Sequence, residues 1–227
     1  MTDSRVRQRR VALGRLAVVA GLLAAGPAGC LRGSLPPRQY YRLSPADSVS
    51  GPARAVNAPP LSGSLGVAVY NTPGIYGSGA LVYRVGTTSY GAYPSREWAI
   101  PLGEMLGALT KEIVHGRGLT SGRVAYDAPD SKNQPYEWRG TVREFDEVDG
   151  ASSVAASVSL AAQLVRVADD SVIWSGAVRE TQPVMEARSI DSVVAALSAA
   201  ASRAIARLAD EAANDLRRLA AAGARDR

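Results

Sequence analysis

A single cysteine, Cys30, closes an uncharged run that follows a basic start of the chain. The run extends from Leu16 to Cys30, and five arginines lie before it: Arg5, Arg7, Arg9, Arg10 and Arg15. A basic region, an apolar region and small residues before a cut are typical of an export signal. The run is too short to span a bilayer, which needs about 20 apolar residues. We therefore expect residues 1–29 to be a removed signal peptide, and the mature chain to depend on its core alone, without a disulfide.

The residues before this cysteine resemble the lipobox of bacterial lipoproteins, where signal peptidase II cuts before a diacylglycerol-modified cysteine. Ala28 and Gly29 fit that pattern, whereas Pro27 stands where leucine is usual. The resemblance implies lipidation of Cys30 by diacylglycerol and a further acyl chain such as palmitate, which together form a stable anchor. By resemblance to the sorting rule of enteric lipoproteins, Leu31 in place of aspartate implies sorting to the periplasmic face of the outer membrane. A stray cysteine in an ordinary signal peptide is the alternative, and the two adjacent arginines before the run leave twin-arginine export open.

The net charge of +5 comes mostly from the predicted signal peptide, because that segment contains five arginines and one acidic residue, Asp3. The mature chain, near +1, therefore lacks the basic surface expected of a protein that binds nucleic acid. His115 is the single histidine, and it precedes glycines at a predicted helix end, where a cation meets the helix dipole favourably. One histidine and no free thiol leave little for a zinc site or a Ser-His-Asp triad. No metal, cofactor or catalytic residue is predicted.

The mature chain is expected to form a tether and one domain. Residues 30–63 are rich in Ser, Pro, Ala and Gly and predict a lipid-anchored tether with a short strand near residues 39–44. Residues 64–222 are enough for one domain, which at this size buries roughly 70% of its unfolded-chain surface. The mixture of alternating and helical apolar patterns favours an α/β (α+β) fold with a largely antiparallel sheet.

The first half of the domain is predicted from its apolar periodicity and its turn residues. Strands are expected at 64–70, 80–85 and 122–126, with a turn at 71–74 and a flexible loop at 75–79. Residues 87–96 are expected to be a polar loop. A helix then follows whose apolar face begins at Trp98 and which ends at Gly116 or Gly118.

The second half predicts a three-stranded meander and a long helix. The strands are expected at 136–146, 154–166 and 172–181, with a bulge near Glu144 where the apolar phase changes. An alanine-rich apolar stripe predicts the helix from about Ser189, its N-cap, to about Ala221. We expect this helix to cover the sheet. The alternative is that its end joins a second copy of the chain.

Taken in order, these segments resemble the ABC-type transport auxiliary lipoproteins, the family that includes the lipoprotein of the paraquat-inducible operon. The resemblance rests on the order and spacing of short motifs: Tyr40–Pro45, Leu65–Val67, Pro73–Tyr76, Leu81–Arg84, Tyr93, Glu97–Ala99, Pro101–Leu102, Val142–Phe145, Leu160–Ala162 and the alanine-rich last helix. It implies a mixed sheet packed by two main helices, similar to the anticodon-binding-domain and TolB amino-terminal folds. It also implies partners, because members accompany an MCE-domain protein, a permease and an ATPase that move phospholipids or other lipids between membranes. The lipoprotein is expected to dock the periplasmic MCE assembly at the outer membrane.

Aromatic residues and arginines gather between residues 70 and 98, and these residue types are favoured at interface hot spots. The candidate partner-binding residues are Tyr76, Arg84, Tyr90, Tyr93 and Arg96. Packing in the core is the alternative, and it is the one that we expect for Tyr83 and Trp98.

Parts of the sequence are also consistent with two other functions. Glu144 and Asp146, with Glu147 and Asp149 beside them, resemble the paired carboxylates of an acid–base enzyme. A solvated strand end explains these acids as well, so we expect no enzymatic activity. The remaining alternative is a lipoprotein with a TolB-like fold that activates a cell-wall synthase or another envelope assembly.

Overall fold

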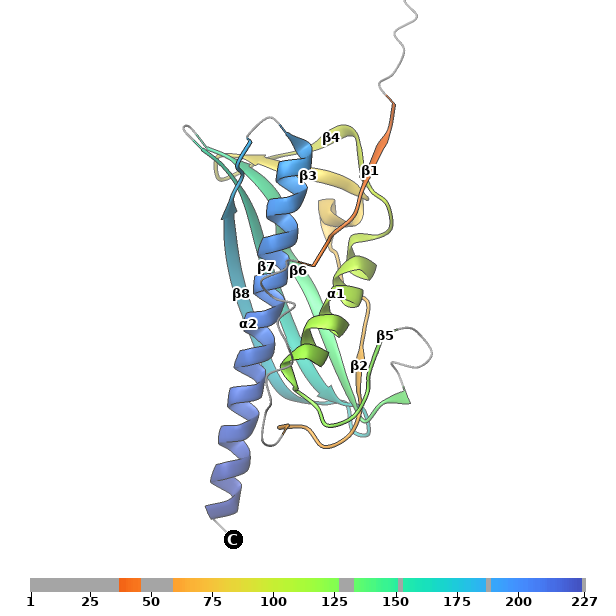
Figure 1. Cartoon of the computed structure of the whole chain (residues 1–227), viewed down its shortest axis with the longest axis vertical. Helices are drawn as coiled ribbons and strands as arrows, with labels where there is room; N and C mark the ends of the chain where they lie inside the picture. The colour runs from red at the N-terminus through yellow and green to blue at the C-terminus, as the bar shows by residue number, and fades with distance from the viewer. Residues whose placement is uncertain (1–36, 46–58, 127–132, 151–152, 187–188, 226–227) are drawn as a thin grey trace, which may run out of the picture. The chain divides into compact units, whose positions relative to one another are not determined.

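The fold was analysed in a computed structural model, which describes residues 37–45, 59–126, 133–150, 153–186 and 189–225 (Figure 1). Residues 37–225 form one compact unit in which strands precede and separate two helices. The elements are β1 (Gln39–Tyr41), β2 (Leu65–Val67), the 3₁₀ turn η1 (Gly74–Gly77), β3 (Ala80–Val85), β4 (Ser89–Trp98), α1 (Leu102–Arg117), β5 (Val124–Tyr126), β6 (Tyr136–Asp149), β7 (Val154–Arg166), β8 (Ser171–Pro183) and α2 (Ile190–Arg225).

Strand β6 is the centre of a mixed sheet. Along one side it pairs in parallel with β2 near its start and with β3 near its end. Along the other side it begins the antiparallel meander β6–β7–β8. Strand β4 continues the sheet beyond β3, and β1 pairs with β4 in parallel. The expected α+β fold with a mixed sheet and two helices is therefore confirmed.

Both helices pack on one face of this sheet, and they also contact each other (Figure 1). In α2 the apolar stripe, from Val193 to Ala213, is buried against β7, β8 and α1. The segment Ile190–Ala222 is long and apolar enough to cross a bilayer, with a mean hydropathy of 1.3, but 72% of its apolar window is buried inside the domain. A core helix has that property. The expectation that this helix covers the sheet is confirmed, and Figure 1 shows its last turns extending beyond the sheet.

Several local predictions are confirmed by the structure. The register of β6 against β7 shifts between Val142 and Glu144, which places the expected bulge at the residue between them. The backbone N–H of Ser192 donates to Oγ of Ser189, which is the predicted cap of α2. Helix α1 ends at Gly118, which adopts the left-handed conformation (φ 60°) that glycine tolerates best.

Two segments of the first half were predicted wrongly. Residues 87–96 are not a loop, because most of them lie in β4, which forms a hairpin with β3 after a tight turn at Gly86. The strand carries few buried side chains, and Ser95 has a positive φ of 57°, so its sequence shows no apolar alternation. Trp98 ends this strand and does not belong to α1. The expected flexible loop at 75–79 instead contains η1.

The hydroxyl of Tyr70 is buried in the core. It shares a 2.9 Å hydrogen bond with Oγ1 of Thr110 on α1 and accepts another, of 3.1 Å, from Nε1 of Trp138 on β6. Burial raises the pKa of Tyr70 to about 12, so its hydroxyl remains protonated. The three side chains tie the first helix to the central strand, and Gly140 lies directly under the Tyr70 ring.

Candidate partner-binding site

The five predicted partner-binding residues do not form one surface. Tyr76 and Arg84 donate hydrogen bonds to Asp146, and the Arg84 guanidinium lies 5.9 Å from the centre of the Tyr90 ring. Tyr93 instead donates a hydrogen bond to Glu147, the next residue of β6. Because successive side chains of a strand point to opposite faces, the sheet separates these two groups.

The pairing register assigns each group to a face. Glu147 lies opposite Ala156 of β7, and Asp146 lies opposite Ser157. Trp174 of β8 lies on the helix-covered face, because its Nε1 donates a hydrogen bond to Asp215 of α2. Trp174 pairs with Leu164 of β7, which is an even number of residues from Ala156, so Ala156 lies on the same face. Glu147 and Tyr93 are therefore on the helix-covered face, and Asp146 with its partners is on the other.

Asp146 is fully buried at the centre of an ionic network on the helix-free face. Its carboxylate accepts a 2.8 Å hydrogen bond from Nε of Arg84 and one of 3.1 Å from the Tyr76 hydroxyl. The same guanidinium lies 3.7 Å from Glu144, which also pairs with Arg179. Burial raises the pKa of Asp146, and the arginine and tyrosine offset part of that rise. Within this network the two arginines balance the charges of the two carboxylates.

These acids are not the solvated strand end that the sequence suggested, because Asp146 and Glu147 are both buried. The reason is tertiary: β3 pairs with the end of β6 and brings Arg84 and Tyr83 alongside, while η1 brings the buried Tyr76. Tyr76 is therefore a core residue. Of the five predicted residues only Tyr90, which is 46% exposed, has a largely accessible side chain. Arg96 is half-buried at the sheet edge and donates to Gln39.

Glu147 has one hydrogen-bond donor, the hydroxyl of Tyr93 at 2.6 Å, and no ion pair with a described residue. Burial raises its pKa, the tyrosine offsets part of the rise, and the Asp149 carboxylate adds to it. A carboxyl group with a raised pKa in the folded state stabilises the fold fully only below its unfolded pKa. That contribution is lost as the pH rises through the folded pKa.

Glu147→Gln, which copies the protonated form, is therefore expected to raise the free energy of unfolding near neutral pH and to change it little at about pH 4. Urea denaturation of both proteins across this pH range measures the difference. Glu112→Gln, at an exposed position of α1, is the matched control and should show no such trend. An equal effect of Glu147→Gln at both pH values would contradict the assignment.

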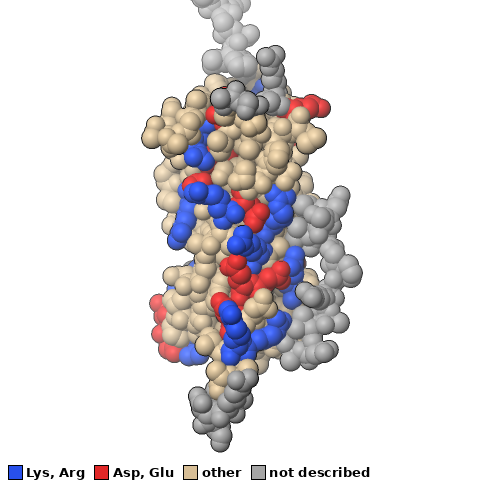
Figure 2. All heavy atoms as spheres, turned by 90° about the vertical axis from the view of Figure 1, so that its left-hand side faces the viewer, with Lys and Arg blue, Asp and Glu red and all other residues tan. Residues whose placement is uncertain are grey.

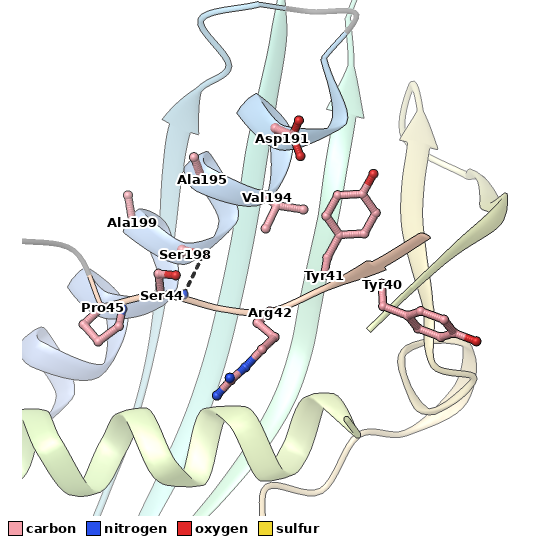
Figure 3. Close-up of a pocket in the computed structure, with 10 residues that line it drawn as sticks. All are labelled: Tyr40, Tyr41, Arg42, Ser44, Pro45, Asp191, Val194, Ala195, Ser198 and Ala199. Atoms are coloured by element: carbon pink, nitrogen blue, oxygen red, sulfur yellow. Dashed lines mark hydrogen bonds between the residues drawn. The ribbon is translucent and has the colours of Figure 1, made fainter. Parts of the chain in front are cut away.

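A groove that the sequence did not reveal lies between β1 and α2, with a volume of about 580 Å³ (Figure 3). One wall consists of Tyr40, Tyr41, Arg42, Ser44 and Pro45. The other consists of Asp191, Val194, Ala195, Ser198 and Ala199 from the first turns of α2. The sequence predicts a short strand near residues 39–44 and a family motif at Tyr40–Pro45, but the other wall of the groove is remote in sequence. No periodicity could have indicated the groove.

The edge formed by α2 and β8 carries charges of both signs (Figure 2). Glu180 of β8 lies 3.5 Å from Arg203 and 3.5 Å from Arg207, and Arg207 also pairs with Glu211 one turn later. These residues are partly exposed and pair with one another, which is typical of charges at a protein surface.

Among solved structures, a protein from Xanthomonas campestris matches with a TM-score of 0.63 and 23% sequence identity, over 75% of this chain and 92% of its own. An uncharacterized protein matches with a TM-score of 0.51 and 18% identity, over 81% and 99%. These matches show the fold. A looser match, with a TM-score of 0.41 and 19% identity over 64% and 84%, is to the PelC dodecamer from Paraburkholderia phytofirmans. No curated protein sequence matches the chain.

The model of one protein family, described as the ABC-type transport auxiliary lipoprotein component, matches residues 41–213. The matched region begins at the last residue of β1 and extends into α2, so it contains almost the whole described fold. The description indicates a lipid-anchored protein of the cell envelope that works with an ABC transport system. On this match the chain belongs to the ABC-type transport auxiliary lipoprotein family.

Proposed function

We propose that the protein is the outer-membrane lipoprotein subunit of an MCE-type ABC transport system. In this role it docks the periplasmic MCE assembly and supports the movement of phospholipids or other lipids between the membranes. The observation that carries the proposal is the family match over residues 41–213. A compact domain with an amino-terminal anchor suits a subunit that holds a soluble assembly near a membrane.

The membrane attachment depends on Cys30, which lies outside the described residues, so its lipidation stays a prediction from the sequence. The compact unit begins at Pro37, within the predicted tether and shortly after the cysteine in sequence, so the proposed anchor is close to the domain along the chain. The outer membrane is favoured by Leu31, which follows the cysteine where an inner-membrane lipoprotein would carry aspartate.

The role that we propose is not enzymatic. The two carboxylates that could have served as an acid–base pair are engaged by cations, Asp146 by Arg84 and Glu144 by Arg84 and Arg179. A carboxylate held in that way is a poor proton donor or acceptor for a substrate. Their arrangement instead supports a structural role in the sheet.

Co-purification tests the docking role. The full-length lipoprotein, extracted from membranes in mild detergent, is expected to recover an MCE-domain subunit of the same cell. A Cys30→Ala variant is the control for lipidation: signal peptidase II cuts before the modified cysteine, so this variant should keep residues 1–29 and carry no lipid while its domain stays folded. Recovery of cell-wall enzymes without any MCE subunit would instead support the TolB-like alternative. Mass spectrometry of the mature amino terminus tests lipidation separately.

A further inference from the structure

The groove between β1 and α2 is bounded on one side by the edge of β1 that pairs with no other described strand. The carbonyl of Tyr41 accepts a 2.8 Å hydrogen bond from the N–H of Ala99, so the main-chain groups of Tyr41 point toward β4. In a parallel pair the neighbouring residues point their N–H and C=O groups the other way. The main-chain groups of Tyr40 and Arg42 therefore point away from β4. These groups of Tyr40 and Arg42 form no main-chain hydrogen bond with a described residue.

One contact fixes the direction in which this free edge faces. The N–H of Ser44, which has the same parity as Tyr40 and Arg42, donates to Oγ of Ser198 on α2 at 3.3 Å. Figure 3 shows this bond across the groove. The unpaired main-chain donors and acceptors thus face the helix, with the open space of the groove between.

The part of α2 that lines the groove differs in residue type from the rest of the exposed side of this helix. Further along, that side carries Arg203, Arg207 and Glu211, which form ion pairs. Beside the groove it carries Ala195 and Ala199, over the buried Val194 and Ser198. Small apolar side chains leave room for a chain segment and offer it contacts without a charge to desolvate.

Two charged side chains, those of Arg42 and Asp191, line the groove. Neither Arg42 nor Asp191 forms an ion pair with a described residue, and both are exposed. Tyr40 is 59% exposed beside them. A segment lying in the groove could therefore bring a basic side chain to Asp191 and an acidic one to Arg42.

We propose that this groove binds an extended peptide segment, which adds to the free edge of β1 as a new strand and packs its side chains on Ala195 and Ala199. We take the segment to belong to the periplasmic subunit of the transport system, and to that extent the inference rests on the proposed function. The unpaired N–H and C=O groups along β1 identify the ligand as a peptide backbone, because a polypeptide strand offers the same groups at the matching spacing. An acyl chain would leave them unsatisfied.

The sharpest test changes the backbone alone. Arg42→Pro removes the Arg42 N–H, one of the main-chain donors that point into the groove, and Arg42→Ala removes the same side chain but keeps the N–H. Tyr41 precedes the substitution in an extended strand, which is the conformation that proline permits. Arg42→Pro is expected to weaken binding to the purified MCE-domain subunit by about tenfold, and Arg42→Ala by less than about threefold. Equal effects of the two variants would overturn the strand addition.

A second pair of variants tests the helical wall. Ala195→Arg fills the groove and should weaken the same interaction by at least about tenfold. Ala177→Arg, at an exposed position of β8 far from the groove, is the matched control and should leave it unchanged. Thermal melting of each variant in detergent shows whether the fold persists. Unchanged binding of a folded Ala195→Arg protein would overturn the proposal.

Photocrosslinking identifies the occupant directly. A benzoylphenylalanine residue at position 199 of the full-length, membrane-bound protein is expected to crosslink to one extended segment of the MCE-domain subunit. A crosslink within the same chain or to a second copy would overturn the proposal by assigning the groove to another occupant. If the wild-type protein recovers no MCE subunit, the proposed function itself fails. If it recovers one that every groove variant also binds, only this inference fails.

Discussion

Asp146→Ala is expected to lower the free energy of unfolding by about 3 kcal/mol, because it breaks a buried ion pair and leaves the other charge uncompensated. Asp146 is fully buried, and the Arg84 side chain is 17% exposed, so water cannot readily replace the lost carboxylate. The Tyr76 hydroxyl loses its acceptor as well. Urea denaturation followed by the fluorescence of the three tryptophans measures the change.

Two variants show whether this loss comes from the buried charge. Glu211→Ala removes an exposed carboxylate from an ion pair within α2 and should leave the unfolding midpoint almost unchanged. Arg84→Met combined with Asp146→Leu replaces both charges by apolar side chains and should recover most of the stability that the single variant loses. A double variant as unstable as Asp146→Ala would show that shape, and not uncompensated charge, sets the cost.

Gly140→Ala is expected to destabilise the protein by about 1–3 kcal/mol through overpacking. A Cβ atom at this position would lie 2.2 Å from Cε1 of Tyr70, well inside van der Waals contact. The ring cannot move aside easily, because its hydroxyl is held by Thr110 and Trp138. The effect should therefore fall at the upper end of that range, and thermal or urea denaturation measures it.

Gly116→Ala is the matched control. This glycine lies in the last turn of α1, where an added Cβ meets no atom within 4 Å. Alanine is the better helix former, so the substitution should stabilise the protein by roughly 0.5–1 kcal/mol. If Gly140→Ala proved as harmless as Gly116→Ala, the Tyr70 ring would have to be more mobile than its two hydrogen bonds imply.

Much of the fold follows from local sequence patterns. The alternation in Val154–Arg166 gave the bounds of β7, and the change of apolar phase after Val142 located the bulge in β6. The stripe from Ile190 onward predicted α2, and Gly118 predicted the end of α1. These signals depend on the periodicity of one element against one buried face, which a single sequence records directly.

The surroundings of the candidate site residues could not be predicted from local patterns. The sequence predicts partner binding for Tyr76, Arg84 and Tyr93 because they are aromatic or basic. In the structure they lie on two faces of the sheet and donate hydrogen bonds to the buried acids Asp146 and Glu147. The side chains of β4 are largely outside the core, so this strand has no alternation to reveal it. The sequence shows which aromatic and basic residues are present. Their contacts are made by strands that are far apart in the chain, as β3 and β6 are.

The sequence by itself determined the family, the fold class and the elements from β6 to α2, because each rests on local periodicity or on motifs in a fixed order. Only the tertiary structure decided which face each strand residue occupies and which partner it meets. The parallel pairing of β3 with β6 buries Asp146 against Arg84, and the position of β1 opens a groove against α2. The physical reason is that contacts between distant segments depend on register and on chain crossing, and no local pattern in one sequence specifies either of them.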